Sequence, residues 1–123
     1  MSTPKGRILC TEDHPDTREL IILALTQAGF EAECADDPHR LLDLAKSGRF
    51  NLFLVDTWMP KVSGLELCKQ IREFDAATPI LFLSGAALET DKAAALAAGA
   101  QGYLVKPIAL EVLVNEVTRL AGN

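Results

Sequence analysis

Long apolar runs are missing from this sequence of 123 residues. No stretch approaches the roughly 18 consecutive apolar residues of a membrane span, and the polar lead from Met1 to Gly6 does not resemble a signal peptide. Positive charge is also scarce, since 12 Lys and Arg face 17 Asp and Glu, for a net charge of −5. Direct binding to nucleic acid usually needs a basic face. We therefore expect a cytoplasmic protein with no direct contact to membrane or nucleic acid.

Cysteine is rare as well, with three residues at Cys10, Cys34 and Cys68. The number is odd, and no two of them form a CxxC pair. Such spacing supports neither a disulfide framework nor a cysteine metal site. We expect three free thiols, buried or half-buried, in a reducing compartment.

The chain has no obvious linker and no low-complexity tract. Its length is typical of one domain and is sufficient for a hydrophobic core. Apolar residues make up 49% and charged residues 24%, as in ordinary globular proteins. We expect a single domain over residues 1–123.

Apolar strand-like segments and amphipathic segments alternate five times along the chain. Strands are expected over Arg7–Thr11, Glu31–Cys34, Leu52–Asp56, Ile80–Ser84 and Gly102–Lys106. Helices are expected over Pro15–Ala28, Pro38–Ser47, Gly64–Glu73, Glu89–Ala98 and Ala109–Leu120. The apolar face of the first helix is expected to comprise Leu20, Ile21, Leu23, Ala24 and Ala28. This alternation predicts parallel strand pairing with right-handed crossovers.

The two strand segments that begin at Leu52 and Ile80 are apolar on both faces, as a sheet covered by helices on both sides requires. Asp37 and Ser63 are suited to cap the helices that follow them. The predicted fold is α/β, a doubly wound sheet of five parallel strands in the flavodoxin-like order 2-1-3-4-5.

Acidic residues stand where two of the predicted strands end. Glu12 and Asp13 follow the first strand, and Asp56 ends the third. In the predicted strand order these two strands are neighbours, so the three carboxylates should converge. Their mutual repulsion would be relieved by a hard divalent cation, and Mg²⁺ suits such oxygen ligands. We expect Mg²⁺, with Mn²⁺ as the alternative ion, and the carbonyl of Trp58 as a backbone ligand.

With a metal bound, Asp56 could attack phosphorus as a nucleophile, since carboxylates form aspartyl phosphates. A transferring phosphoryl group is negative and needs cationic and hydrogen-bond-donating groups around it. Lys106 and Ser84, at the ends of the last two strands, supply an ammonium and a hydroxyl. Backbone N–H donors are expected from Thr57, Trp58 and Gly85.

Four segments carry a family resemblance that covers nearly the whole chain. They are Glu12-Asp13, Asp56-Thr57-Trp58-Met59-Pro60 with Gly64, Ser84-Gly85-Ala86, and Tyr103-x-x-Lys106-Pro107. Together they resemble the receiver domain of a two-component response regulator. The resemblance implies that Asp56 is the phosphoacceptor and that Glu12 and Asp13 hold Mg²⁺. It also implies that Lys106 contacts the phosphoryl group, that Ser84 is the switch hydroxyl and that Tyr103 is the switch aromatic residue.

The family also implies a mechanism and partners. A histidine kinase or a histidine phosphotransfer protein donates a phosphoryl group from phosphohistidine to Asp56. Ser84 then moves towards the phosphate and Tyr103 turns into the vacated space. This remodels the face formed by the helix after Ser84, the strand of Tyr103 and the last helix, where a downstream protein binds. Apart from accepting and losing its own phosphoryl group, the protein is not expected to be an enzyme.

Trp58 bears on how long the phosphoryl group survives. In this family, the position two residues after the phosphoacceptor faces the phosphoryl group. Neither the apolar ring of Trp58 nor the small Ala86 offers a side chain to orient an attacking water. We therefore expect slow autodephosphorylation.

Three other functions fit parts of this pattern. A haloacid-dehalogenase-type phosphatase needs a second acid two residues after its nucleophile, where this chain has Trp58. A flavodoxin-type electron carrier needs a phosphate-binding first loop, whereas Glu12 and Asp13 would repel a phosphate. The remaining alternative is a phosphorylation-independent interaction module of the same fold, which no residue in the sequence favours.

Overall fold

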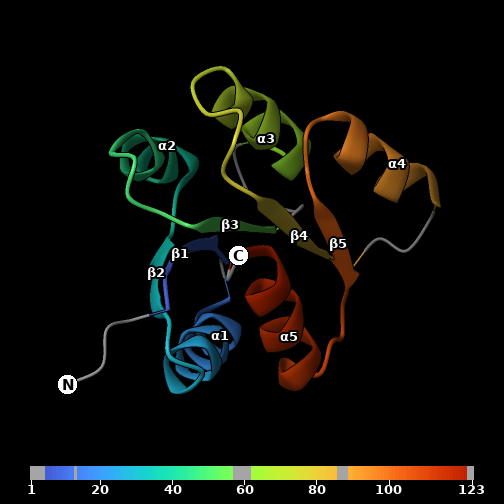
Figure 1. Ribbon diagram of the computed structural model, residues 1–123. Coiled ribbons are helices and arrows are strands. Elements are labelled where there is room, and N and C mark those ends of the chain that lie inside the picture. The colour runs from blue at the N-terminus through green and yellow to red at the C-terminus, as the bar shows by residue number, and fades with distance from the viewer. Residues whose placement is uncertain (1–4, 13, 57–61, 86–88, 122–123) are drawn as a thin grey trace.

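A computed structural model describes residues 5–12, 14–56, 62–85 and 89–121 of the chain. Within these ranges, five strands alternate with five helices (Figure 1). The strands are β1 (Arg7–Thr11), β2 (Glu31–Ala35), β3 (Leu52–Asp56), β4 (Ile80–Ser84) and β5 (Gly102–Val105). The helices are α1 (Pro15–Gln27), α2 (Pro38–Lys46), α3 (Gly64–Arg72), α4 (Glu89–Ala97) and α5 (Leu110–Ala121).

The strands form one parallel sheet in the order β2-β1-β3-β4-β5, which confirms the predicted topology. Helices α1 and α5 cover one face, and α2, α3 and α4 cover the other (Figure 1). Every residue of β3 and β4 is buried, as expected for strands covered on both sides. No helix in the described ranges is long and apolar enough to cross a membrane.

Two helix starts follow the predicted capping chemistry. The Asp37 carboxylate accepts hydrogen bonds from the backbone N–H groups of His39 (2.7 Å) and Arg40 (3.3 Å). The Ser63 hydroxyl accepts one from the N–H of Glu66 at 3.1 Å. These bonds satisfy N–H groups that have no partner within the helix, and so fix where α2 and α3 begin.

The predicted apolar face of α1 is partly wrong. Leu20 and Leu23 are 52% and 53% exposed, whereas Ile21 and Leu25 are buried. Helix α1 carries apolar residues around most of its circumference, but only one stripe can face the sheet. The buried pair is spaced four residues apart and therefore lies along one face of the helix.

The prediction of three free thiols is wrong for two of them. Cys10 in β1 lies opposite Cys34 in β2, with the two Cα atoms 4.5 Å apart, and a disulfide joins their side chains. The strand register brings them together across 24 positions of sequence. Cys68 is a free and buried thiol, as predicted. Burial raises the pKa of the Cys68 thiol despite the nearby charge of Arg72, so this sulfur resists ionisation.

A single arginine ties the end of α3 to the segment between α4 and β5. The guanidinium of Arg72 donates to the carbonyl oxygen of Gly99 through Nε (3.1 Å) and Nη2 (2.8 Å). Nη2 also donates to Oε1 of Gln101 at 2.8 Å, and Nη1 donates to the carbonyl of Asp75 at 2.9 Å. The same Gln101 oxygen accepts the backbone N–H of Ile80 at 2.8 Å, where β4 begins.

Replacing Arg72 by alanine is expected to lower the free energy of unfolding by about 2 kcal/mol, because charge-assisted bonds to two carbonyls are lost. Urea denaturation followed by circular dichroism measures the change. Arg40→Ala, at an exposed position on α2, is the matched control, and its effect is expected to stay within about 0.5 kcal/mol. Equal effects of the two substitutions would show that the Arg72 contacts do not stabilise the fold.

Candidate functional site

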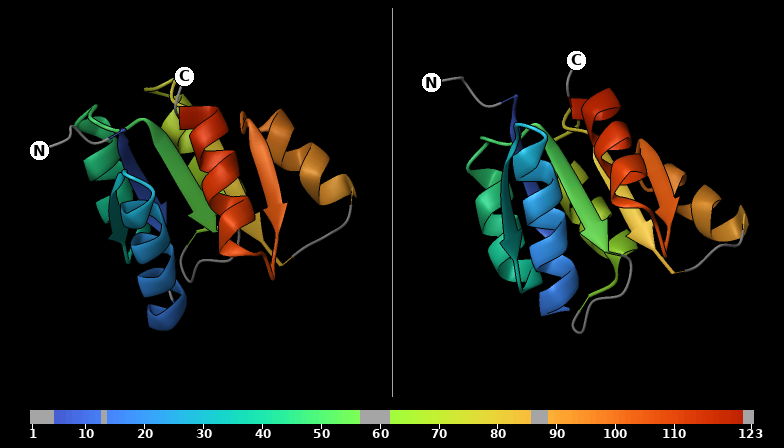
Figure 2. Two further views of the ribbon diagram at one scale, coloured as in Figure 1. Left: turned by 60° about the horizontal axis from the view of Figure 1, so that its bottom comes forward. Right: turned by 90° about the horizontal axis from the view of Figure 1, so that it is seen from below.

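Four of the predicted site residues lie at the same edge of the sheet. Asp56 and Ser84 are the last residues of β3 and β4, while Glu12 and Lys106 directly follow β1 and β5. All these strands are parallel, so their carboxyl ends share one edge, towards which the strand arrows point in Figure 2. From β1 the chain first adds β2 on one side and then β3 on the other, so the strand order reverses between β1 and β3, and this creates the topological switch point at which such folds bind ligands.

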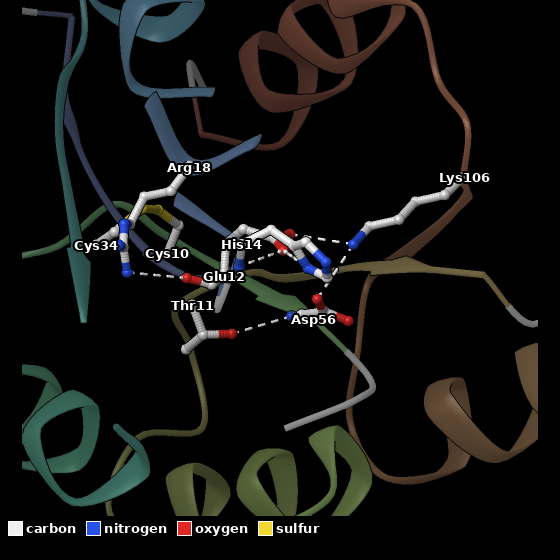
Figure 3. Close-up of a disulfide and its surroundings, with 8 residues drawn as sticks. All are labelled: Cys10, Thr11, Glu12, His14, Arg18, Cys34, Asp56 and Lys106. Atoms are coloured by element: carbon white, nitrogen blue, oxygen red, sulfur yellow. Dashed lines mark hydrogen bonds and ion pairs between the residues drawn. A yellow bond between two sulfur atoms is a disulfide. The ribbon is translucent and has the colours of Figure 1, made fainter. Parts of the chain in front are cut away.

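Two buried carboxylates share one ammonium group at this edge. Glu12 is 2% exposed and Asp56 is 5% exposed. Nζ of Lys106 donates to Oε1 of Glu12 at 3.0 Å and to Oδ2 of Asp56 at 3.1 Å (Figure 3). Without an opposite charge, two carboxylates removed from water in this way would be costly. Lys106 therefore does more than the sequence predicted, because it holds both acids together.

The environment of Lys106 shifts its acid–base equilibrium. Burial lowers the pKa of the ammonium, but the hydrogen bonds and charges of Glu12 and Asp56 outweigh this and raise the pKa above its ordinary value. A folded-state pKa above the unfolded one means that the proton on Lys106 stabilises the fold throughout the neutral range. This contribution is lost only as the pH rises through the raised pKa.

Two further side chains position the acids, and the sequence analysis missed both. The hydroxyl of Thr11 accepts the backbone N–H of Asp56 at 3.0 Å, across the β1–β3 boundary. Nη1 of Arg18, in α1, donates to the carbonyl oxygen of Glu12 at 3.2 Å. A polar Thr at the end of an apolar strand was a signal for the first contact. No comparable sequence signal marks Arg18.

Ser84 and Gly85 occupy the end of β4. Ser84 is fully buried, and its carbonyl oxygen accepts the backbone N–H of Lys106 at 2.7 Å. The end of β4 is therefore tied to the residue that holds both acids. Gly85 is exposed, and a Cβ atom placed there would meet no heavy atom of the described residues within 4 Å. The binding of a phosphate by the Gly85 backbone stays a prediction. The Lys106–Pro107 peptide bond is cis.

Tyr103, the predicted switch aromatic, lies in β5 and is partly buried. Its ring stacks on Phe82 of β4, with ring centroids 6.1 Å apart and an interplanar angle of 20°. It packs against the core beneath α2, α3 and α4. This arrangement gives Tyr103 a structural role, and its movement in a switch stays a prediction.

Three predicted site residues, Asp13, Thr57 and Trp58, lie outside the described residues. Among the residues that are described, no group of three or more metal-ligating side chains occurs. The buried carboxylates of Glu12 and Asp56 nevertheless fit Mg²⁺ in kind, because Mg²⁺ prefers a few carboxylate oxygens together with other oxygen ligands. These two residues would hold the ion.

The fold and the site together define a doubly wound α/β domain with a buried acidic cluster at its switch point. Residues 8–118 match the model of the response regulator receiver domain family. The chain belongs to this family. A probable transcriptional regulatory protein of Picosynechococcus is 38% identical over 117 residues, covering 89% of this chain and 47% of that protein. The chain spans about half the length of the curated relatives it matches.

Solved structures show the same fold. The chemotaxis protein CheY4 of Vibrio cholerae has a TM-score of 0.88 at 32% identity, covering 94% of this chain and 98% of its own. The response regulator TrrA of Thermotoga maritima, solved in complex with Mg²⁺ and BeF, has a TM-score of 0.83 at 30% identity. It covers 93% of this chain and 97% of its own.

Proposed function

We propose that this domain accepts a phosphoryl group from a phosphohistidine onto Asp56, in a reaction that requires Mg²⁺. The observation that carries the proposal is the pair of buried carboxylates, Glu12 and Asp56, bridged by Nζ of Lys106. Such a cluster supports the proposal because it would bring together a nucleophile, ligands for a metal ion and a cation. The partner is a histidine kinase or a histidine phosphotransfer protein.

In the transfer, a carboxylate oxygen of Asp56 forms a bond to phosphorus as the phosphorus–nitrogen bond of phosphohistidine breaks. Bound Mg²⁺ would supply positive charge next to the oxygens of the transferring group. Lys106 already contacts the Asp56 carboxylate, so its ammonium is placed to neutralise a phosphate oxygen once the bond forms. The Glu12 carboxylate is held by the same ammonium group and would serve as a ligand of the metal ion.

Phosphorylation of Asp56 could alter the protein surface through the connected ends of β4 and β5. Lys106 and Ser84 are joined through their backbones, and Tyr103 lies two residues before the end of β5. If the Ser84 hydroxyl turns towards a phosphate, the β4 and β5 ends must adjust together. We propose that this shifts the α4-β5-α5 face between two packings, and that a downstream protein recognises one of them.

The proposal extends to the metal ion, the lifetime of the phosphoryl group and the location of the protein in the cell. Mn²⁺ is expected to substitute for Mg²⁺. Autodephosphorylation is expected to be slow, because neither Trp58 nor Ala86 offers a side chain that would orient an attacking water. Beyond this self-modification the domain is not expected to turn over a substrate. We place it in the cytoplasm, with no direct contact to nucleic acid made by these residues.

The test is intact mass spectrometry of the protein incubated with acetyl phosphate, or with a phosphorylated histidine donor, in the presence of Mg²⁺ or of EDTA. We expect one phosphoryl adduct with Mg²⁺ and none with EDTA. Reduction with borohydride, which converts an aspartyl phosphate to homoserine, followed by peptide mapping should place the adduct on Asp56. No adduct with either donor would reject the proposal and favour the phosphorylation-independent module.

A further inference from the structure

The Cys10–Cys34 disulfide is close in the chain to the acidic cluster of Glu12 and Asp56, because Cys10 stands two residues before Glu12. Figure 3 shows it together with Glu12, Asp56 and Lys106. Cys10 is followed by Thr11, which accepts the backbone N–H of Asp56, and then by Glu12. Cys10 is thus two residues from Glu12 in the chain, and it is linked to Asp56 through the hydrogen bond of its neighbour Thr11.

The disulfide also closes a covalent loop around α1. Its two sulfurs are 24 positions apart in sequence, and the whole of α1 lies between them. Within that loop is Arg18, whose guanidinium donates to the carbonyl oxygen of Glu12. Two of the contacts that position the acids, from Thr11 and from Arg18, thus belong to the unit that the disulfide closes.

The two cysteines differ in how deeply they are buried. Cys10 is fully buried, whereas Cys34 is only partly buried and lies on β2, the edge strand of the sheet. Thiol–disulfide exchange needs an attacking or attacked sulfur that an external thiol can reach. Cys34 is the more exposed residue of the two and so the better placed to meet an external thiol, and Cys10, directly opposite in the strand register, can then complete or release the bond.

We propose that Cys10 and Cys34 form a reversible redox-modification site that sets how tightly the Glu12–Asp56 pocket binds Mg²⁺. The inference rests on the proposed function, because Mg²⁺ is the ion that the pocket is proposed to use. In the oxidised protein the bond fixes the end of β1 and the acids that follow it. In the reduced protein two separate thiols occupy this space, the end of β1 gains freedom, and the pocket is less well ordered for the ion.

The chemistry balances with a low-molecular-weight disulfide, such as glutathione disulfide, as the oxidant. The Cys34 thiolate attacks the small disulfide and releases one small thiol, leaving a mixed disulfide. The Cys10 thiol then attacks the Cys34 sulfur, releases the second small thiol and forms the protein disulfide. The two cysteines lose two electrons and two protons in all, and the oxidant gains them. Two equivalents of a small thiol reverse the process.

The experiment has a redox readout and a binding readout. The protein is equilibrated in buffers of different ratios of reduced to oxidised glutathione, alkylated, and its free thiols are counted by intact mass. We expect the count to change between three thiols and one, the remaining thiol being Cys68. The Mg²⁺ affinity of the fully oxidised and fully reduced forms is then measured by calorimetry, with circular dichroism to establish that both are folded.

We expect the reduced protein to bind Mg²⁺ about 3-fold to 10-fold more weakly, which is less than the roughly 10-fold to 100-fold caused by removing a residue behind a metal ligand, because here the supporting contacts are loosened and not removed. Cys34→Ser should bind like the reduced form under all conditions. Cys68→Ser, the matched control, should retain the difference between the two states.

A pair that stays reduced across the glutathione series would overturn the inference, and so would a pair that no small thiol can reduce. Mg²⁺ affinities that agree within about twofold between the two forms would overturn it as well, since the expected loss is larger. If both forms bind Mg²⁺ and accept a phosphoryl group equally, the redox inference alone fails. If neither form binds Mg²⁺ or accepts a phosphoryl group, the proposed function fails with it.

Discussion

Replacing Asp56 by asparagine will reduce phosphoryl uptake by more than about 10³-fold, because an amide oxygen is far less nucleophilic than a carboxylate. The substitution keeps the shape of the side chain. Lys106 keeps its 3.0 Å bond to Glu12, and the backbone N–H at position 56 can still donate to Thr11. The loss should therefore come from chemistry and not from misfolding, and the free energy of unfolding should change by no more than about 1 kcal/mol.

The measurement is the modified fraction at saturating acetyl phosphate, determined by intact mass, together with urea denaturation of both proteins. Asp43→Asn, at an exposed position on α2, is the matched control and should accept the phosphoryl group like the unaltered protein. Uptake by the Asp56→Asn variant at the normal rate would mean that another residue is the acceptor.

Replacing Lys106 by methionine will lower the free energy of unfolding by about 3 kcal/mol in the absence of metal, because two buried carboxylates lose the cation that they share. The expected figure is at the low end of the range for a broken buried ion pair, since the Lys106 side chain is 30% exposed and water screens part of the charge. Methionine keeps most of the aliphatic stem, so little packing is lost.

Mg²⁺ should restore part of this stability, since a divalent cation can take over the neutralisation of Glu12 and Asp56. Urea denaturation with and without Mg²⁺ should show a larger stabilisation by the ion in Lys106→Met than in the unaltered protein. Lys92→Met removes an exposed 3.7 Å ion pair to Glu89 on α4 and should change the stability by no more than about 0.5 kcal/mol. A Lys106→Met variant as stable as this control would show that the acids do not need Lys106.

Sequence patterns were sufficient for the sheet and for most of the pocket, for identifiable physical reasons. Parallel strands must end at a common edge, so the acids, Ser84 and Lys106 could be placed together before any contact was known. The caps at Asp37 and Ser63 are local, within three residues of the N–H groups they satisfy. Features that depend only on residues close in sequence, such as the helix caps, or on strand order, such as the shared edge of the site residues, could be predicted.

Features that depend on strand register or on the direction of a helix face were missed. The disulfide between Cys10 and Cys34 follows from a register in which Arg7 lies opposite Glu31. Aligning the first residues of the two predicted strands would have placed these cysteines side by side, but an odd number of cysteines argued against a pair. Helix α1 carries too many apolar residues for its pattern to select one face, so Leu20 and Leu23 were misassigned.

The strand order β2-β1-β3-β4-β5 has a consequence for how signals could combine. Strand β3, which carries Asp56, is the middle strand of five. On one side of it lie the strands that carry the paired cysteines, and on the other lie those that carry Ser84 and Tyr103. An oxidant would thus act on the strands on one side of Asp56, and the proposed conformational response would occur in the strands on the other side. Such a domain would respond to two signals at once. A kinase would determine whether Asp56 is phosphorylated, and the redox state of the cell would determine how readily this happens, through the affinity for Mg²⁺.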